Sequence, residues 1–408
     1  MERSRFVLMG GGMVAGYAAK QLVESGMKKG ELTILTADSL PPYERPPLSK
    51  SFLAGRDTNE SILINPESFY RDHGIDLRLG CHVTSIDPAQ KQVSLASGGR
   101  LAYEKLVVAT GCRPKVLNVP GHDLDRVLYL RSAGDSQAIR ERMAQSKRAV
   151  VIGGGFIGME VASVLAQQGN EPVMVFPADR VWKQFFTPEM SRFFEAYFAA
   201  RGVQMVKQAS VARILGDGAV RGVALEGGRV LDCDFVVPGI GASPSLDALA
   251  GSGISLDDGV VVNEFLETDQ RDILAAGDIA NYPDLVFGTR RRVEHWDNAV
   301  AQGQYCARQL TGERAPFRHV PYFFSDVFDL SYEFWGDPEG AGSVISRGDL
   351  STNQFSVWWL KAGVLNASFV MNRPAEERDY AAKWIEARQR VSAAKLADEK
   401  TPIGEAAE

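Results

Sequence analysis

The chain has 408 residues, of which 45% are hydrophobic and 24% are charged, and its formal net charge is −6. A chain of this length exceeds one hydrophobic core, so two or three domains are expected. The negative charge argues against nucleic acid as a main partner, because phosphate binding requires a basic surface. No stretch of the sequence is apolar enough to suggest a membrane span.

The N-terminal stretch, residues 6–16, reads FVLMGGGMVAG and predicts a short buried strand that turns into a helix. Gly10, Gly12 and Ala15 fit the G-x-G-x-x-G/A pattern of dinucleotide-binding turns. Glycine lets the backbone approach a pyrophosphate, which the free N–H groups of the helix start attract. Asp38 follows the second predicted strand, where a carboxylate can accept from a ribose hydroxyl. A purely structural glycine turn is the alternative at this point.

The next segment, residues 41–50, reads PPYERPPLSK and predicts a stiff extended loop, because proline fixes φ and disfavours a helix. Arg45 and Lys50 on this loop can hold positive charge against a bound anion or a reducible ring. A solvated charged loop is an equal alternative. Beyond it, the residue pattern predicts a short helix over residues 67–73 and strands over residues 76–79, 83–86 and 92–95.

An apolar strand over residues 106–109 ends in Thr110 and Gly111. Small residues at the carboxyl end of a parallel strand mark the edge at which such sheets bind ligands. Arg113 follows and leads out of the first domain.

The opening pattern repeats at residues 149–168, where an apolar strand meets a helix through Gly153, Gly155 and Gly158. Repetition of the strand–turn–helix frame indicates two dinucleotide-binding domains. After the next strand, over residues 172–176, a carboxylate would support NADH and an arginine would support the 2′-phosphate of NADPH. Asp179 supplies the carboxylate and Arg180 supplies the arginine, so both cofactors remain open, and we favour NADH slightly.

Strands over residues 203–206, 211–215, 220–225 and 235–237 are expected to close the second domain, with Gly241 in a glycine-rich exit. Residues 268–278 predict a short strand that ends in Ala-Gly-Asp. Asp278 would then face a ligand at the carboxyl edge of the sheet and accept from sugar or ribityl hydroxyls. His295, next to an aromatic residue, is expected to be packed or hydrogen-bonded in the core, and a helix follows it.

From Pro321 the chain becomes aromatic-rich, and the pattern predicts a β-hairpin over residues 355–371 followed by a helix over residues 376–396. The tail after about Val391, rich in Ala, Lys and Glu, is expected to fray. The expected domains are residues 1–118 with 245–315, residues 119–244, and residues 316–408.

The four cysteines, Cys81, Cys112, Cys233 and Cys306, are far apart in the sequence. No closely spaced pair indicates a metal cluster or a thioredoxin-like centre. We expect small buried side chains in a reducing cytoplasm. Basic residues near the N-terminus are compatible with a secretory signal, but the glycine turn explains this stretch better.

Taken in order, these motifs resemble a flavoprotein of the glutathione reductase superfamily. PYERPPLSK, RRVEHWDNA and PYFFSDVFDLSYEFWG resemble the branch that holds monodehydroascorbate reductases, ferredoxin and rubredoxin reductases and apoptosis-inducing-factor-like proteins. The resemblance implies an α/β fold of two Rossmann-like domains plus a C-terminal α+β domain. It also implies an FAD-dependent enzyme that takes a hydride from NAD(P)H.

The resemblance further implies which residues serve the cofactors. Lys50 would be the catalytic residue, a cation near the isoalloxazine that stabilises reduced flavin. Asp38 would bind the adenosine ribose, Val83 the adenine by its backbone, and Trp296 would lie at the pyrimidine side of the flavin. The full cofactor-binding set is Gly10, Gly12, Ala15, Asp38, Arg45, Lys50, Val83, Thr110, Gly111, Arg113, Gly153, Gly155, Ile157, Gly158, Glu160, Asp179, Gly241, Asp278, Glu294, Trp296 and Asp326, with no metal.

Two departures from the relatives narrow the choice of electron acceptor. Residues 39–53 hold no cystine, so the resemblance excludes a disulfide relay. Plant monodehydroascorbate reductases carry an arginine where this chain has Asp326, and a tyrosine where it has Trp358, and a carboxylate would repel the ascorbyl anion.

The favoured acceptor is therefore a ferredoxin or rubredoxin, for which residues 290–292 and Arg113 offer a local basic docking patch. The alternatives are a monodehydroascorbate or quinone reductase, which uses a small-molecule one-electron acceptor, and a redox sensor like apoptosis-inducing factor. A homodimer is a possible assembly.

Overall fold

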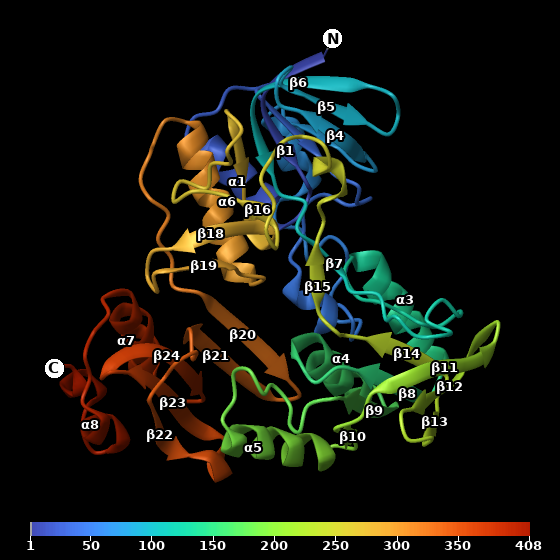
Figure 1. Cartoon of the computed structure of the whole chain (residues 1–408), viewed down its shortest axis with the longest axis vertical. Coiled ribbons are helices and arrows are strands. Elements are labelled where there is room, and N and C mark those ends of the chain that lie inside the picture. Colours follow the sequence, from blue (N-terminus) through green and yellow to red (C-terminus); the bar gives the residue numbers. More distant parts are fainter. Residues whose placement is uncertain (1) are drawn as a thin grey trace. The chain divides into compact units, whose positions relative to one another are not determined.

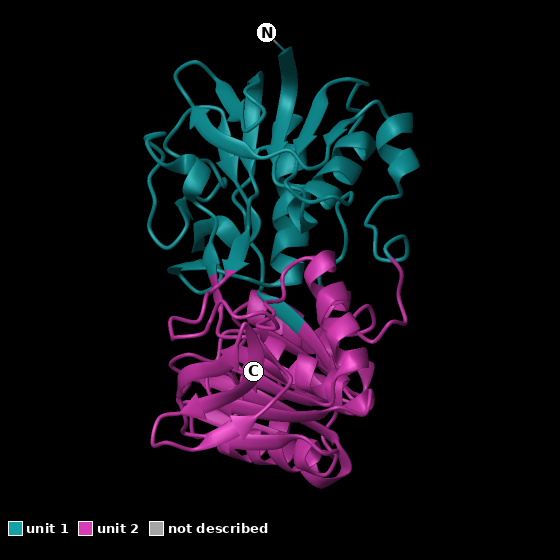
Figure 2. Cartoon of the chain, turned by 90° about the vertical axis from the view of Figure 1, so that its right-hand side faces the viewer, with its two compact units in different colours: residues 1–45, 59–113, 243–323 teal, residues 46–58, 114–242, 324–408 magenta. Residues whose placement is uncertain are grey.

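The computed structural model describes residues 2–408, which fall into two compact units of non-contiguous segments (Figure 2). Unit 1 holds residues 2–45, 59–113 and 243–323, and unit 2 holds residues 46–58, 114–242 and 324–408. Both units mix helices with sheets, so the expected α/β class is confirmed. None of the helices in residues 2–408 has the length and apolarity needed to cross a membrane.

The main sheet of unit 1 has the strand order β3-β2-β1-β6-β5-β4, with β17 beside β6 (Figure 1). The strands β1, β2, β3, β6 and β17 pair in parallel. Val7, Leu8, Leu106 and Val107 are fully buried, as expected of parallel strands covered on both faces. The strands are β1 (Glu2–Met9), β2 (Leu32–Leu35), β3 (Asp76–Arg78), β4 (Val83–Asp87), β5 (Gln92–Leu95), β6 (Arg100–Val108) and β17 (Ile273–Ala275).

The helices of unit 1 follow the glycine turn and the later sheet edges. They are α1 (Met13–Glu24), α2 (Glu67–Asp72) and α6 (Trp296–Leu310), with the 3-10 helices η2 (Asp247–Leu249) and η3 (Gly277–Ile279). A smaller sheet consists of β16 (Val260–Val261), β18 (Ala280–Asp284) and β19 (Thr289–Arg292). Gly303 of α6 packs against the backbone of Val14 of α1, where a β-carbon would lie 2.7 Å from the Val14 carbonyl oxygen.

Unit 2 begins with a second parallel sheet, of order β10-β9-β8-β14. Its strands are β8 (Arg148–Ile152), β9 (Glu171–Phe176), β10 (Gln204–Lys207) and β14 (Phe235–Pro238). Its helices are α3 (Ala133–Gln145), α4 (Phe156–Gln167) and α5 (Pro188–Ala199). An antiparallel sheet of β11 (Val211–Asp217), β12 (Ala219–Leu225) and β13 (Val230–Asp232) adjoins it, and the connecting strands β7 (Cys112–Pro114) and β15 (Ala242–Pro244) pair with each other.

The C-terminal part of unit 2 is a five-stranded antiparallel sheet of order β20-β21-β24-β23-β22. Tyr332 and Phe369 on this sheet meet Phe194 of α5 at ring distances of 5.4 and 6.4 Å. This aromatic packing explains why the C-terminal part and the second sheet form one unit. The elements are β20 (Tyr322–Val327), β21 (Leu330–Gly336), β22 (Ser343–Asp349), β23 (Gln354–Lys361), β24 (Val364–Met371), α7 (Ala375–Glu386), α8 (Ala393–Ala397), η4 (Leu350–Thr352) and η5 (Ile403–Ala406).

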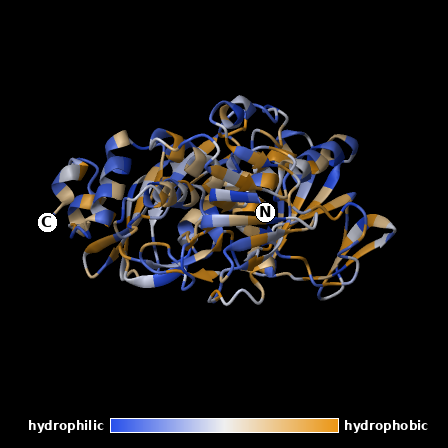
Figure 3. Ribbon diagram, turned by 90° about the horizontal axis from the view of Figure 1, so that it is seen from above, coloured by the Kyte–Doolittle hydropathy of each residue, from blue (hydrophilic) through white to orange (hydrophobic). Residues whose placement is uncertain are grey.

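The predicted strands and the helix over residues 67–73 are largely confirmed, and the predicted β-hairpin is β23 with β24. Hydrophobic and hydrophilic residues alternate along the outer helices (Figure 3), the pattern on which such predictions depend.

The prediction of an extended loop is wrong over residues 46–49, which form the 3-10 helix η1 (Pro46–Ser49). Proline is compatible with the first positions of a helix because its missing N–H has no helical partner there.

The predicted helix over residues 376–396 is confirmed only as far as Glu386, and the predicted frayed tail is wrong. The helix ends at Glu386, and Leu396 and Ala406 farther along are fully buried. Arg347 of β22 provides the reason. Its guanidinium donates to the carbonyls of residues 396, 398, 399 and 401 at 2.6–3.4 Å and to the carboxylate of buried Glu377 at 3.1 Å. One buried cation thus fastens the C-terminal segment.

We expect Arg347→Met to lower the free energy of unfolding by about 3–5 kcal/mol, because Glu377 and the carbonyls lose a buried charged partner. Limited proteolysis should then cut within residues 391–408. Arg390→Met is the control, since this exposed arginine donates to one carbonyl of residue 362. Equal protease resistance of wild type and Arg347→Met would contradict the interpretation.

Candidate functional site

In unit 1 the turn between β1 and α1 contains two different kinds of glycine. Gly10 has φ of +124°, and a β-carbon on it would lie 2.1 Å from the carbonyl oxygen of Ala109. Gly12 has open space around its missing side chain and begins α1 with no side-chain cap. Ala15 is fully buried in the packing of α1. The uncapped helix start behind an open glycine fits a dinucleotide pyrophosphate.

Asp38 and Arg45, both predicted to contact the first cofactor, lie together. The Asp38 carboxylate accepts from the Tyr43 hydroxyl at 2.6 Å and lies 3.8 Å from the Arg45 guanidinium. Arg45 also donates to the Tyr43 hydroxyl at 2.9 Å and lies over its ring. Tyr43 is fully buried and holds both charged groups in place. The cluster places hydrogen-bonding groups just after β2.

Trp296 is held by a residue that the sequence analysis passed over. The Trp296 indole donates to Glu44 at 2.6 Å, and the Tyr17 hydroxyl donates to the other oxygen of that carboxylate at 2.6 Å. Burial, and then the Glu44 carboxylate, raise the pKa of Tyr17 well above its usual range. Glu44 therefore orients two aromatic side chains from α1 and α6. Its position between Tyr43 and Arg45 in PPYERPPLSK was the available signal.

The two predicted strand ends also converge within unit 1, because β17 pairs in parallel with β6. The Thr110 hydroxyl donates to the carbonyl of Ser245 at 2.9 Å, and Gly111 has φ of +63°. Asp278 lies in η3, directly after Gly277, on which a β-carbon would lie 2.7 Å from Val14. The carboxyl edge of this sheet thus gathers backbone groups beside the start of α1.

Arg292 links this edge to Glu294. Its guanidinium donates to Glu294 at 2.5 Å and to the backbone carbonyl of Asp278 at 2.9 Å, and it lies 3.2 Å from the Cys112 sulfur. His295, beside Glu294, is packed as expected. Its ring lies 5.0 Å from the ring of Phe323, and burial lowers its pKa to about 4.

Three of the four arginines of the expected basic docking patch have acidic partners, so this surface carries less net positive charge than the sequence suggests. Arg291 lies 3.2 Å from buried Asp284, and Arg292 pairs with two carboxylates. Arg113 pairs with Asp247. Sequence alone did not reveal these partners, which the β18–β19 hairpin and η2 bring close.

In unit 2 the second glycine turn repeats the first. Gly153 has φ of +130°, and a β-carbon on it would lie 2.2 Å from the carbonyl oxygen of Gly239. A β-carbon on Gly158 would lie 2.2 Å from the carbonyl oxygen of Gly153. Gly155 is open and begins α4 without a side-chain cap, and Ile157 in the first turn is exposed. This turn likewise fits a dinucleotide.

The loop after β9 carries the predicted ribose end of this second site. Trp182 ties the loop to the turn, since its backbone N–H donates to the carbonyl of Gly154 at 2.9 Å. Asp179 lies 3.3 Å from Arg180 and 3.0 Å from Lys183, and the hydrogen bond from Lys183 lowers the pKa of its carboxyl. The acid and the two cations form a triad of net charge +1.

Glu160 of α4 and Lys50 form a buried ion pair, which the sequence analysis did not foresee although it selected both residues. The Lys50 ammonium lies 2.8 Å from the Glu160 carboxylate, with 14% and 5% of the side chains exposed. Ser49 and Ser325 also donate to this carboxylate. Lys50 lies 5.6 Å from the Phe324 ring centre.

The remaining predicted residues lie apart from these clusters. Val83 is half-buried on β4, and Gly241 has φ of +102° beside the Lys115 side chain. Asp326 is half-buried on β20. Trp358 is fully buried and donates to Ser356 at 2.9 Å, so it belongs to the interior of the C-terminal sheet rather than to an acceptor surface.

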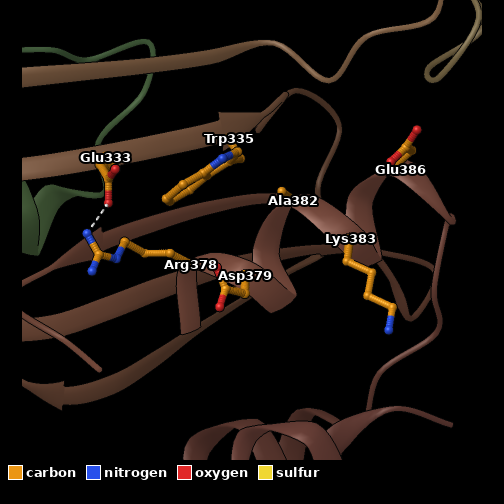
Figure 4. A pocket seen from close by; sticks show the side chains of 7 residues that line it. All are labelled: Glu333, Trp335, Arg378, Asp379, Ala382, Lys383 and Glu386. Atoms are coloured by element: carbon orange, nitrogen blue, oxygen red, sulfur yellow. Dashed lines mark hydrogen bonds and ion pairs between the residues drawn. The ribbon is translucent and has the colours of Figure 1, made fainter. Parts of the chain in front are cut away.

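A pocket of about 550 Å³ opens between β21 and α7 (Figure 4). Trp335 and the Glu333–Arg378 ion pair, at 3.3 Å, line it together with other charged residues of α7. None of the predicted cofactor-binding residues contributes to it. Its mixed charges point to no single ligand.

Comparisons with known proteins agree with this arrangement. Residues 4–303 match the family model described as pyridine nucleotide-disulphide oxidoreductase, and residues 322–407 match the one described as reductase C-terminal. Monodehydroascorbate reductase 3 of Arabidopsis thaliana is 32% identical over 97% of this chain and 96% of its own length.

Two solved structures are similar over nearly the whole chain. The ferredoxin reductase for the CYP199A2 system of Rhodopseudomonas palustris is 34% identical, with a TM-score of 0.94 over 99% of this chain and all of that one. The reductase of the covalent putidaredoxin reductase–putidaredoxin complex is 31% identical, with a TM-score of 0.94 over 99% of this chain and 98% of that one.

The chain belongs to the pyridine nucleotide-disulphide oxidoreductase family. It is an NAD(P)H-dependent flavoprotein oxidoreductase with FAD as its cofactor. The family, fold and cofactors expected from the sequence are confirmed.

We expect Gly12→Ala to fold but to lose FAD, because its φ of −91° and open surroundings accept a β-carbon that would then occupy the ligand's approach. The change itself should cost about 1 kcal/mol of stability at most. Gly10→Ala should fail to fold. Flavin absorbance per chain and circular dichroism separate the two outcomes, and a Gly12→Ala protein with full flavin would contradict the assignment.

Proposed function

We propose that this protein is a ferredoxin reductase, which passes single electrons from NAD(P)H to a small iron–sulfur protein. The observation that supports an external acceptor is the state of the cysteines. Residues 39–53 contain no cysteine, and Cys81, Cys233 and Cys306 form no disulfide, with Cys233 and Cys306 buried. The chain therefore offers no dithiol that could take both electrons from the reduced flavin. The free thiols of Cys81, Cys233 and Cys306 also support a reducing compartment, and we propose the cytoplasm.

FAD, when bound, supplies the chemistry that accepts a hydride and releases electrons singly. The chain's own residues would bind the cofactors and orient them. The open turn at Gly12, with Asp38 and Arg45 near it, would hold the FAD dinucleotide, and the turn at Gly155 would hold NAD(P)H. Lys50 would stabilise negative charge as a buried cation.

We retain the other predicted cofactor-binding residues and the domain bounds as part of this proposal. FAD would bind residues 1–118 and 245–315, NAD(P)H would bind residues 119–244, and residues 316–408 would form the C-terminal domain. A plausible assembly is a homodimer.

A second candidate, monodehydroascorbate reductase, is supported by the similarity to the Arabidopsis enzyme. Asp326 argues against it, because a half-buried carboxylate would repel an ascorbyl anion at that position. A redox sensor like apoptosis-inducing factor is the candidate of a different class.

Steady-state turnover with NADH should be at least about tenfold more efficient with a [2Fe–2S] ferredoxin than with ascorbyl radical, the equivalent of about 1.4 kcal/mol. Ferricyanide serves as the control for flavin reduction. Preference for ascorbyl radical would support the second candidate. Slow flavin bleaching with NADH-dependent dimerisation would support the sensor.

Asp179→Asn should raise kcat/KM for NADPH by about tenfold, the worth of one charge-assisted hydrogen bond, because Arg180 and Lys183 become free for a 2′-phosphate. kcat/KM for NADH should fall. Ferricyanide as acceptor keeps this measurement independent of the physiological partner. Glu189→Gln, an exposed acid of α5 paired with Arg192, is the matched control. An unchanged NADPH/NADH ratio would refute the role of the triad.

A further inference from the structure

Three distant segments of unit 2 meet at one buried carboxylate. Glu160 of α4 accepts from the Lys50 ammonium at 2.8 Å and from the Ser325 hydroxyl at 2.6 Å, both on Oε1. The Ser49 hydroxyl donates to Oε2. Ser49 and Ser325 are 4% and 0% exposed. The C-terminal sheet therefore contributes directly to the Lys50–Glu160 pair.

The two hydroxyls have a defined electrostatic effect. A buried carboxylate is costly unless donors stabilise its charge, and hydrogen bonds to the ionised form favour it. Ser325 donates to the same oxygen that faces Lys50, so it withdraws electron density from that oxygen. Without this donor, Glu160 would pair more strongly with Lys50 and neutralise more of its positive charge.

Ser325 is also held firmly at α4. The backbone N–H of Phe328, the first residue after β20, donates at 2.8 Å to the hydroxyl of Ser163, which lies one helical turn beyond Glu160. The Tyr197 hydroxyl of α5 then donates to the Asp329 carboxylate. These contacts fix the register of β20 on α4, so the Ser325 hydroxyl has a set position relative to the carboxylate.

We propose that Ser325, assisted by Ser49, is a positioning residue that sets how much of the Lys50 charge acts on the flavin. The C-terminal domain thereby tunes the reduction potential of FAD. This inference rests on the proposed role of Lys50 as the cation that stabilises reduced flavin, but not on the identity of the electron acceptor.

The test is dye-coupled potentiometry of the FAD-loaded protein. Lys50→Met should lower the potential, and Glu160→Gln should raise it. Ser325→Ala should shift the reduction equilibrium toward oxidised flavin by about threefold or more, a part of the worth of a hydrogen bond to a charged group. Ser325→Thr, which keeps the hydroxyl, should restore the wild-type potential. Ser49→Ala should shift it in the same direction as Ser325→Ala.

The decisive arm combines Ser325→Ala with Glu160→Gln. If Ser325 acts through the carboxylate, its removal should have no further effect once Glu160 is neutral. Ser356→Ala is the matched control, because this buried serine donates to another buried carboxylate, Glu377, at 2.6 Å. It should affect stability and leave the potential unchanged.

If Lys50→Met shifts the reduction potential of FAD but Ser325→Ala does not, the inference is overturned and the proposed function still holds. A Ser325→Ala shift that persists with Glu160→Gln would also overturn it. If Lys50→Met leaves the reduction potential unchanged, the premise that Lys50 stabilises reduced flavin is wrong and the inference is overturned with it. Ferredoxin turnover is measured separately, so its failure would count against the proposed acceptor alone.

Discussion

Two backbone contacts that exclude any side chain determine where the dinucleotide turns lie. A β-carbon on Gly10 or Gly153 would fall within 2.2 Å of a carbonyl oxygen at the end of a neighbouring strand segment. These glycines are required by the fold itself, whether or not a ligand is bound. Gly12 and Gly155 face open space instead, so the fold does not require glycine there, whereas the proposed dinucleotides do. The same division of roles in both turns is strong evidence that both bind dinucleotides.

The spacing of the glycines made both turns predictable from the sequence. The Lys50–Glu160 ion pair could not be predicted in this way. Lys50 and Glu160 were each selected from the sequence, yet 110 residues separate them and no periodicity connects the two positions. Glu44 was missed because the loop around it was interpreted through its cations. The acidic partners of the basic patch were missed for a related reason, since a triplet of arginines does not reveal the acids, such as Asp284, that a hairpin brings alongside.

The C-terminal segment shows how tertiary contacts override composition. Its Ala, Lys and Glu content favours a long helix or a frayed end. The chain instead breaks after Glu386 and returns to the sheet, where Arg347 satisfies several carbonyls that a continuous helix would have paired internally. A single buried guanidinium thus decides the path of a segment whose own sequence suggests otherwise.

Relatives named for different acceptors match nearly the whole of this chain, so the shared architecture does not by itself determine the acceptor. Strand β20 offers two neighbouring positions with separate consequences. Ser325 is fully buried against Glu160, and Asp326, the next residue, points to the opposite face and is only half-buried. On the roles proposed above, a change at Ser325 would act on the flavin through Lys50, whereas a change at Asp326 would act on the charge that an incoming acceptor meets. Potential and specificity could therefore diverge independently within one strand.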